Sequence, residues 1–221
     1  MTGEHSFTIR WRWLVVLAGI VLLACARAGD FSDVKNLRSA GANIICFGDS
    51  LTEGVGAGSG EDYPSVLSRL IPYPVINAGR PGDTVGDGLG RLDAAVLRGN
   101  PRLVIILFGG NDFLRQVPLA ETKKNLDEMI RRIHEAGAMV AVVAMRLGLF
   151  TDEYGPLYRE IAREHGAFLI SGALQGILSD AKLKSDAIHP NGAGYRLLAE
   201  RVAAAIKPLL EEADRKRGPL P

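Results

Sequence analysis

The sequence has few of the residues that build disulfide frameworks, metal sites or nucleic-acid interfaces. It has two cysteines, four histidines and a net charge of +1 in 221 residues, with acidic and basic residues interleaved. Two cysteines are too few for a disulfide framework, and His5, His134 and His165 lack the spacing of metal ligands. Without a basic stripe to displace counterions from phosphates, we expect no nucleic-acid partner, and we expect no metal or other cofactor.

The N-terminal apolar run is too short to cross a bilayer as a helix. Trp13–Ala26 has about 14 residues, whereas a spanning helix needs roughly 20. Arg10 and Arg12 precede the run and small residues end it, which is typical of a secretory signal peptide. The end of the run also resembles a bacterial lipobox, in which Cys25 would be lipidated. We expect residues 1–26 to be a signal peptide, lipoprotein signal or membrane anchor, and the protein to be exported to the periplasm or tethered in the bacterial envelope.

The remaining length suits a single domain. We expect a polar linker at residues 27–41, a domain at 42–213 and a disordered tail at 214–221, with fraying from the charged residue Glu211 onward. Hydrophobic residues make up 47% of the chain, enough for a core. Cys46 lies in an apolar run and is expected to be a buried, inert thiol. The sequence does not indicate an oligomeric state.

Short apolar runs alternate with helical patterns along this domain. Five runs are predicted to be buried parallel strands: Asn43–Phe47, Val75–Asn77, Leu103–Phe108, Met139–Met145 and Ala167–Ile170. Five stretches are predicted to be helices: Tyr63–Leu70, Thr84–Leu97, Leu119–Ala136, Gly155–Glu164 and Asn191–Leu210. This alternation predicts an α/β fold, a three-layer α/β/α sandwich around a five-stranded parallel sheet in the flavodoxin-like order 2-1-3-4-5.

The segments that follow the strands carry the groups needed for acyl transfer by a serine. Ligands of such sheets bind at the carboxyl ends of the strands, and a nucleophile, a base, an orienting group and oxyanion donors are required there. Ser50 follows the first strand, and His189 and Asp186 come after the fifth. The side-chain amide of Asn111 and the backbone N–H groups of Gly82 and Ser50 are candidate oxyanion donors.

Each of these residues has an ordinary structural interpretation when taken alone. Ser50 could be a helix cap, Asp186 a turn residue and His189 a surface histidine, while Gly82 and Asn111 could lie in simple turns. Asp49, beside Ser50, is more typical of a structural carboxylate at a helix start than of a catalytic one. The catalytic hypothesis rests on their common position, because four separate loops at one predicted edge of the sheet each supply a required group.

These residues also resemble the four sequence blocks of the GDSL, or SGNH, hydrolases. The blocks are Gly48-Asp49-Ser50-Leu51-Thr52, Gly82, Gly109-Gly110-Asn111-Asp112 and Asp186-x-x-His189-Pro190, and the resemblance extends from about Asn43 to Leu210. It implies the SGNH hydrolase fold, Ser50, Asp186 and His189 as catalytic residues, and Ser50, Gly82 and Asn111 as the oxyanion hole.

Within that family, Tyr63-Pro64 and Asn77-Ala78 are similar to the bacterial periplasmic thioesterase, lysophospholipase and arylesterase subgroup. The subgroup usually has Ser-Gly-Asp-Thr in its glycine block, whereas this chain has Arg80-Pro81-Gly82-Asp83-Thr84. Pro81 would stiffen the loop and Arg80 would lie near the pocket mouth. The departure leaves the subgroup, and with it the substrate, open.

The resulting expectation is an ester or thioester hydrolase acting on a small-molecule or lipid ester, with a carbohydrate O-deacetylase of the same fold as an alternative. A glycine-rich loop, residues 54–60, could instead bind phosphate, although no nucleotide-binding pattern occurs there and Glu61 and Asp62 would repel phosphates. A catalytically silent exported binding protein is the third possibility. A lipase-type α/β-hydrolase is disfavoured because there is no G-x-S-x-G motif.

We expect residues 54–60 to form a flexible lip on an apolar groove lined also by residues 145–154, including Leu147, Leu149 and Phe150.

Overall fold

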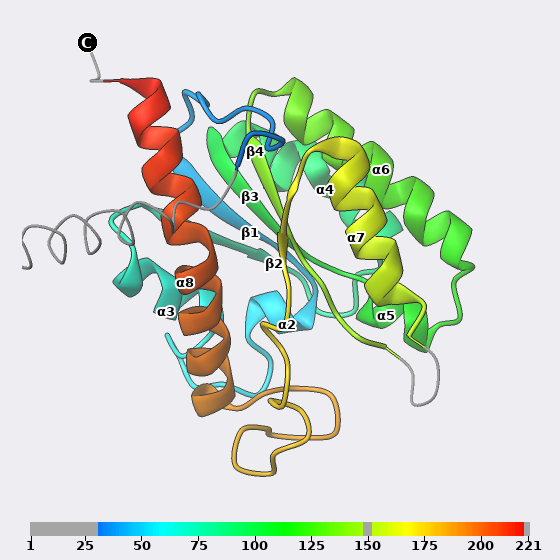
Figure 1. Ribbon diagram of the computed structural model, residues 1–221. Coiled ribbons are helices and arrows are strands. Elements are labelled where there is room, and N and C mark those ends of the chain that lie inside the picture. Colours follow the sequence, from blue (N-terminus) through cyan, green and yellow to red (C-terminus); the bar gives the residue numbers. More distant parts are fainter. Residues whose placement is uncertain (1–30, 148–151, 219–221) are drawn as a thin grey trace, which may run out of the picture. The chain divides into compact units, whose positions relative to one another are not determined.

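A computed structural model describes residues 31–147 and 152–218 of the chain (Figure 1). The expected signal segment, with Cys25 and His5, lies outside the described residues, as do Leu149 and Phe150. In the described part, no helix is long and apolar enough to cross a membrane.

Five parallel strands form one sheet in the order β2-β1-β3-β4-β5, which confirms the predicted topology. The strands are β1 (Asn43–Gly48), β2 (Val75–Gly79), β3 (Pro101–Leu107), β4 (Met139–Val143) and β5 (Phe168–Ile170). Every residue of β3 and β4 is buried, which explains why these strands are continuous apolar runs rather than alternating ones. Cys46 on β1 is buried as expected, and its burial raises the thiol pKa to about 12.

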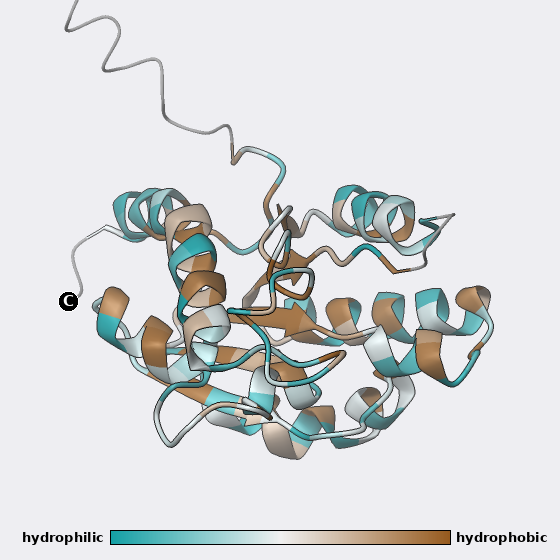
Figure 2. Cartoon of the chain, turned by 90° about the horizontal axis from the view of Figure 1, so that it is seen from below, coloured by the Kyte–Doolittle hydropathy of each residue, from teal (hydrophilic) through white to brown (hydrophobic). Residues whose placement is uncertain are grey.

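Helices cover both faces of the sheet and complete three layers (Figure 1). The longer helices are α3 (Tyr63–Leu70), α4 (Val85–Ala95), α6 (Leu119–Glu135), α7 (Tyr154–His165) and α8 (Gly192–Arg217), and short ones are α2 (Ser50–Glu53), η1 (Leu97–Gly99) and α5 (Gly110–Leu114). On one face α3 packs against α8, and on the other α6 packs against α4 and α7. Figure 2 shows the same division by hydropathy, with brown strands enclosed by helices that carry teal residues on their outer faces.

The expected linker is wrong for residues 31–41, which pack against the domain. Phe31 and Leu37 are buried, and Asn36 Nδ2 donates to the carbonyl oxygens of His134 (2.8 Å) and Ala138 (2.9 Å). These contacts join the segment to the end of α6, so residues 31–41 belong to the same compact unit as the rest of the domain.

The expected tail is wrong for residues 214–217 as well, because α8 continues to Arg217; residues 219–221 lie outside the described residues. Asp214 accepts hydrogen bonds from the guanidinium of the buried Arg102 and from the Tyr73 hydroxyl. A buried guanidinium requires a counter-charge, and Asp214 supplies it from the last turns of the helix. Ala213 is also buried, so the final turns pack against the domain instead of fraying.

Candidate active site

Ser50, His189 and Asp186 form a continuous chain of hydrogen bonds. Ser50 is the first residue of α2, directly after β1. Its Oγ lies 3.0 Å from His189 Nε2, and His189 Nδ1 lies 2.8 Å from Asp186 Oδ2. The structure therefore brings together all three residues that the sequence singles out, although Ser50 and His189 are 139 positions apart.

The histidine and the aspartate share one short segment, residues 184–191, which we call the triad loop. The second carboxylate oxygen of Asp186 accepts from the backbone N–H groups of Ile188 and His189, both at 2.8 Å. The side chain of Asp186 is 52% exposed. The hydrogen bond from His189, followed by the one from Ile188 N–H, lowers the pKa of Asp186 to about 2. Asp186 is thus an ionised hydrogen-bond acceptor at neutral pH.

The glycine-rich loop packs against the triad loop, not along a substrate groove. A Cβ atom added at Gly56 would lie 2.1 Å from Ser185 Oγ and 2.7 Å from Pro190 O, and the φ angle of Gly56 is +92°. Both facts require glycine at this position. The expected lip is therefore wrong, because residues 54–60 do not line the pocket beside Ser50. They support the loop that carries His189.

Two of the proposed oxyanion donors, Asn111 and Gly82, belong to segments that hydrogen bonds connect to each other. Asn111 is in α5, whose N-cap Gly109 has φ +118° and no room for a Cβ atom beside the Tyr158 hydroxyl. Asn111 Nδ2 donates to Asp83 O at 2.9 Å and lies 3.4 Å from Asp49 Oδ2. Gly82 precedes Asp83 in a turn closed by the Asp83 N–H to Arg80 O bond of 3.3 Å. The structure therefore brings Asn111 to the glycine block and to the residue before Ser50.

Two buried carboxylates lie beneath this part of the site. Asp49 Oδ1 accepts from Leu51 N–H at 2.9 Å, which confirms its structural role at the start of α2. Asp112 accepts from Val85 N–H (3.0 Å) and from the Thr122 hydroxyl (3.2 Å). Burial removes water that would stabilise the charge, so it raises the pKa of Asp49 to about 6 and also raises that of Asp112.

The partly buried ion pair between Asp83 and Arg91 was not expected from the sequence. Asp83 Oδ2 lies 2.6 Å from Arg91 Nε, and Arg80 Nε lies 2.9 Å from Asp83 Oδ1. Arg91 also donates to the carbonyl oxygens of Ala78 and Gly48, both at 3.0 Å, and thereby connects the ends of β2 and β1. The hydrophilic face of a helix gives no sequence signal for such a contact. Arg80 pairs with Asp83 and, contrary to expectation, does not line the pocket.

A pocket of about 830 Å³ opens beside the triad. Residues that neighbour the candidate catalytic groups, Leu51, Gly110 and Ile188, form one part of its wall. The end of α5, the segments after β4 and β5 and the first turns of α7 form the rest: Phe113, Leu114, Ala144, Met145, Arg146, Leu147, Asp152, Gly155, Arg159, Ser171, Gly172, Leu174, Gln175, Gly176, Leu178 and Ser179. The sequence prediction included residues 145–147 and 152 of this wall, and it missed the contribution of residues 171–179.

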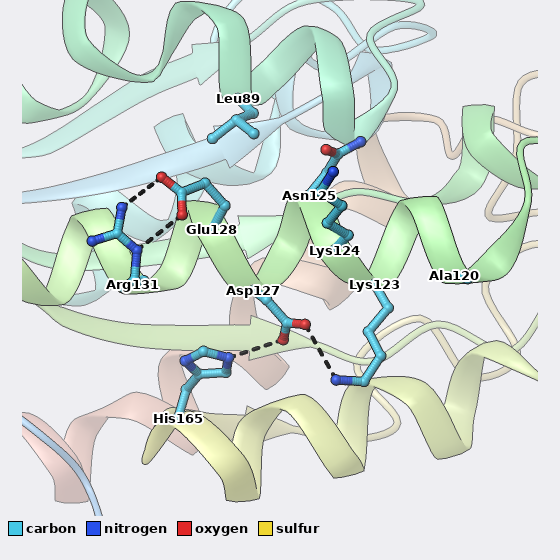
Figure 3. A pocket seen from close by; sticks show the side chains of 9 residues that line it. All are labelled: Leu89, Ala120, Lys123, Lys124, Asn125, Asp127, Glu128, Arg131 and His165. Carbon is cyan, nitrogen blue, oxygen red and sulfur yellow. Dashed lines mark hydrogen bonds and ion pairs between the residues drawn. The ribbon is translucent and has the colours of Figure 1, made fainter.

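A second hollow, of about 550 Å³, lies along α6 and shares no residue with the pocket beside Ser50 (Figure 3). Its charged side chains largely neutralise one another: Asp127 contacts both Lys123 and His165, and Arg131 pairs with Glu128. This hollow contains no nucleophile and base within reach of each other. Across the described residues, no three His, Cys, Asp or Glu side chains are grouped as metal ligands.

The sequence matches the model of the GDSL-like Lipase/Acylhydrolase family over residues 46–197, a span that includes all the candidate site residues. The chain belongs to this family. Esterase TesA of Pseudomonas aeruginosa is 32% identical over 187 residues, covering 78% of this chain and 92% of that protein. Thioesterase 1/protease 1/lysophospholipase L1 of Escherichia coli K12 is 26% identical over 214 residues, covering 93% and 97%.

Solved structures of family esterases agree with this assignment. The crystal structure of TesA has a TM-score of 0.71 at 31% identity, over 76% of this chain and 99% of that one. Esterase EstA from Pseudoalteromonas sp. has a TM-score of 0.70 at 25% identity, over 77% and 99%. An acetylxylan esterase of Geobacillus stearothermophilus is a more distant relative, 26% identical over 200 residues that cover 72% of this chain and 91% of that protein. The GDSL-like chain is therefore an ester hydrolase with an SGNH fold.

Proposed function

We propose that this chain hydrolyses carboxylic esters or thioesters through an acyl-serine intermediate, with Ser50 as nucleophile, His189 as general base and Asp186 as the residue that orients His189. One observation carries the proposal: the 3.0 Å and 2.8 Å contacts that link Ser50 to His189 and His189 to Asp186 at the edge of the sheet. A nucleophile bonded to a base that is itself oriented by a carboxylate is the arrangement that activates a serine hydroxyl.

The reaction follows from these contacts. His189 Nε2 takes the proton of the Ser50 hydroxyl while Oγ bonds to the substrate carbonyl carbon, giving a tetrahedral intermediate. Its oxyanion accepts hydrogen bonds from the N–H groups of Ser50 and Gly82 and from Asn111 Nδ2. Collapse breaks the bond to the leaving oxygen or sulfur, which receives the proton from His189. Water, deprotonated by the same histidine, then releases the acid and restores Ser50.

The substrate we favour has an acyl chain longer than acetyl. The pocket beside Ser50 has about 830 Å³ and walls that include Phe113, Leu147 and Leu174, and burial of each methylene contributes about 0.8 kcal/mol. The relative named lysophospholipase supports this choice, because a lysophospholipid carries a fatty acyl chain. Carbohydrate O-deacetylation is the second candidate, supported by the acetylxylan esterase relatives.

Hydrolysis of p-nitrophenyl esters from acetyl to palmitoyl tests the proposal, with Ser50→Ala in the same assay. We expect activity that peaks beyond acetyl and falls by about 10⁴-fold or more in the variant. Thr52→Ala is a matched control, because it removes a neighbouring hydroxyl of α2 that lies 3.5 Å from the Tyr63 hydroxyl and makes no hydrogen bond with His189. Equal activity in wild type and Ser50→Ala would exclude Ser50 as nucleophile, and activity on acetyl esters alone would favour the deacetylase.

We also propose that residues 1–26 direct export and that Cys25 is the lipidation site. The support is the basic start, the short apolar run and the lipobox-like end of this segment. Fractionation of cells expressing the full chain and Cys25→Ser tests it. Membrane association that is lost in the variant supports lipidation, release into the periplasm by both forms supports a cleaved signal peptide, and retention in the cytoplasm by both contradicts export.

A further inference from the structure

The pocket beside Ser50 has apolar walls but carries an unbalanced positive charge. Three charged side chains line it, Arg146, Asp152 and Arg159. Asp152 is already engaged by two groups, since its Oδ1 accepts from Gly155 N–H at 2.9 Å and its Oδ2 lies 3.4 Å from Arg146 Nε. The one carboxylate of the wall therefore fixes the start of α7 and balances Arg146.

Of the three charged side chains that line the pocket, Arg159 is the one that has no partner of opposite charge among them. It lies one turn after Gly155 on α7, and both residues line the pocket. No carboxylate of residues 31–147 or 152–218 lies within ion-pair distance of its guanidinium. The aliphatic stem of an arginine packs along apolar walls while its guanidinium stays near water, and the planar guanidinium pairs with a carboxylate through two hydrogen bonds.

We propose that Arg159 selects substrates whose acyl chain ends in a carboxylate, that is, monoesters of aliphatic dicarboxylic acids. The alkyl part of such a chain would lie along the apolar wall and its terminal carboxylate would pair with Arg159. The inference rests on the proposed function, because it assigns this pocket to the acyl group that Ser50 receives. Arg159 is a specificity-determining residue in this account and takes no part in bond breaking.

Matched pairs of p-nitrophenyl esters test the proposal: hexanoate against the adipate monoester, octanoate against the suberate monoester, and decanoate against the sebacate monoester. Within a pair the chains have equal length and differ only in the terminal carboxylate. We expect at least one charged ester to be hydrolysed with a higher kcat/KM than its neutral partner, and 0.5 M salt to reduce the difference because it screens an exposed ion pair.

The decisive variant is Arg159→Gln, with Arg163→Gln as its control. Arg163 is one turn farther along α7, is exposed and lies outside the pocket. We expect Arg159→Gln to lower kcat/KM for the favoured charged ester about tenfold, as for the loss of one charge-assisted hydrogen-bonded pair. Activity on the neutral partner should change less than twofold, and Arg163→Gln should affect neither ester.

Three outcomes would overturn the inference. In the first, no charged ester exceeds its neutral partner. In the second, Arg159→Gln lowers both members of a pair equally. The third uses 4-(octanoyloxy)benzoate, an ester whose carboxylate is on the leaving group and not on the acyl chain. If Arg159→Gln lowers hydrolysis of this ester alone, Arg159 recognises the leaving group and not the acyl chain. Failure of the proposed function is distinguishable, because then Ser50→Ala would retain hydrolysis of the neutral esters.

Discussion

Two regions near Ser50 are built in opposite ways: the base side, which holds the proposed base His189, and the oxyanion side, which holds the proposed donors Gly82 and Asn111. On the base side, Asp186 is half exposed, and hydrogen bonds from His189 and its own loop lower its pKa to about 2. On the oxyanion side, Asp49, Asp83 and Asp112 are buried, and burial raises the pKa of Asp49 to about 6 and that of Asp112 as well. Asp186 thus keeps its charge through local hydrogen bonds near water, whereas the carboxyl groups of Asp49, Asp83 and Asp112 are enclosed by the protein.

The contrast indicates which residues serve catalysis alone and which also serve folding. Exposed hydrogen-bonded pairs contribute little to the free energy of unfolding, whereas buried polar networks are costly to disturb. Variants on the base side should therefore lose activity and keep their stability, and variants on the oxyanion side should change stability whether or not they also lose activity. The following experiments test that division, from the largest expected effect on activity to the smallest.

Asp186→Asn should have the largest effect. The amide oxygen can still accept from Ile188 and His189 N–H, but it can no longer stabilise the imidazolium that forms during attack. We expect kcat to fall about 10³- to 10⁴-fold and the urea midpoint at pH 7 to stay close to that of wild type, because Asp186 is exposed. A clearly lower urea midpoint would show that the triad loop also supports the fold.

Asn111→Ala should lower kcat about 10²- to 10³-fold with little change in KM, because an oxyanion donor acts mainly in the transition state. It also removes the 2.9 Å bond to Asp83 O, so the free energy of unfolding should fall by about 1 kcal/mol. Asn125→Ala, in the separate hollow on α6, is the control and should leave kcat unchanged. A loss in kcat of less than about fivefold would exclude Asn111 from the oxyanion hole.

Gly56→Ala should lower kcat about tenfold, because the added Cβ atom would displace Ser185 and Pro190 and shift His189. Gly60→Ala is the matched control. Gly60 also has a positive φ angle, +74°, but a Cβ atom there has no neighbour within 4 Å. Both variants carry similar backbone strain, so an equal loss in the two would attribute the effect to strain and not to contact with the triad loop.

Asp49→Asn should have the smallest effect on activity and the clearest effect on the pH dependence of stability. The pKa of Asp49 is about 6 in the folded protein against 3.8 for an unperturbed carboxyl. Its contribution to stability is therefore fully present below pH 3.8 and is lost as pH rises through 6.

Asparagine does not ionise, so the free energy of unfolding of the variant relative to wild type should increase between pH 4 and pH 7.5, by at most about 3 kcal/mol. Denaturation in urea at the two pH values measures the difference. Asp33→Asn, at an exposed position of the N-terminal segment, is the control. A constant difference between Asp49→Asn and wild type would contradict a raised pKa at Asp49.

Most of the fold could be predicted because buried parallel strands are continuous apolar runs. β1, β3 and β4 lie within one or two residues of the predicted ranges. The short helices α2 and α5 could not be predicted, since four or five residues show no helical periodicity. The end of α8 was missed because its stabilising partners, Tyr73 and Arg102, are more than 100 positions away in the sequence.

The sequence by itself determined the order of the strands, the edge of the sheet that carries Ser50, Asn111 and His189, and membership in the GDSL-like family. These follow from hydrophobic patterning and from the places where strands end, which are local properties of the chain. Only the tertiary structure decided the support of the triad loop by Gly56, the partly buried pair of Asp83 and Arg91, and the charge of the pocket at Arg159. Each of these depends on side chains that meet across long separations in sequence, where packing and desolvation, and not local propensity, select the partner.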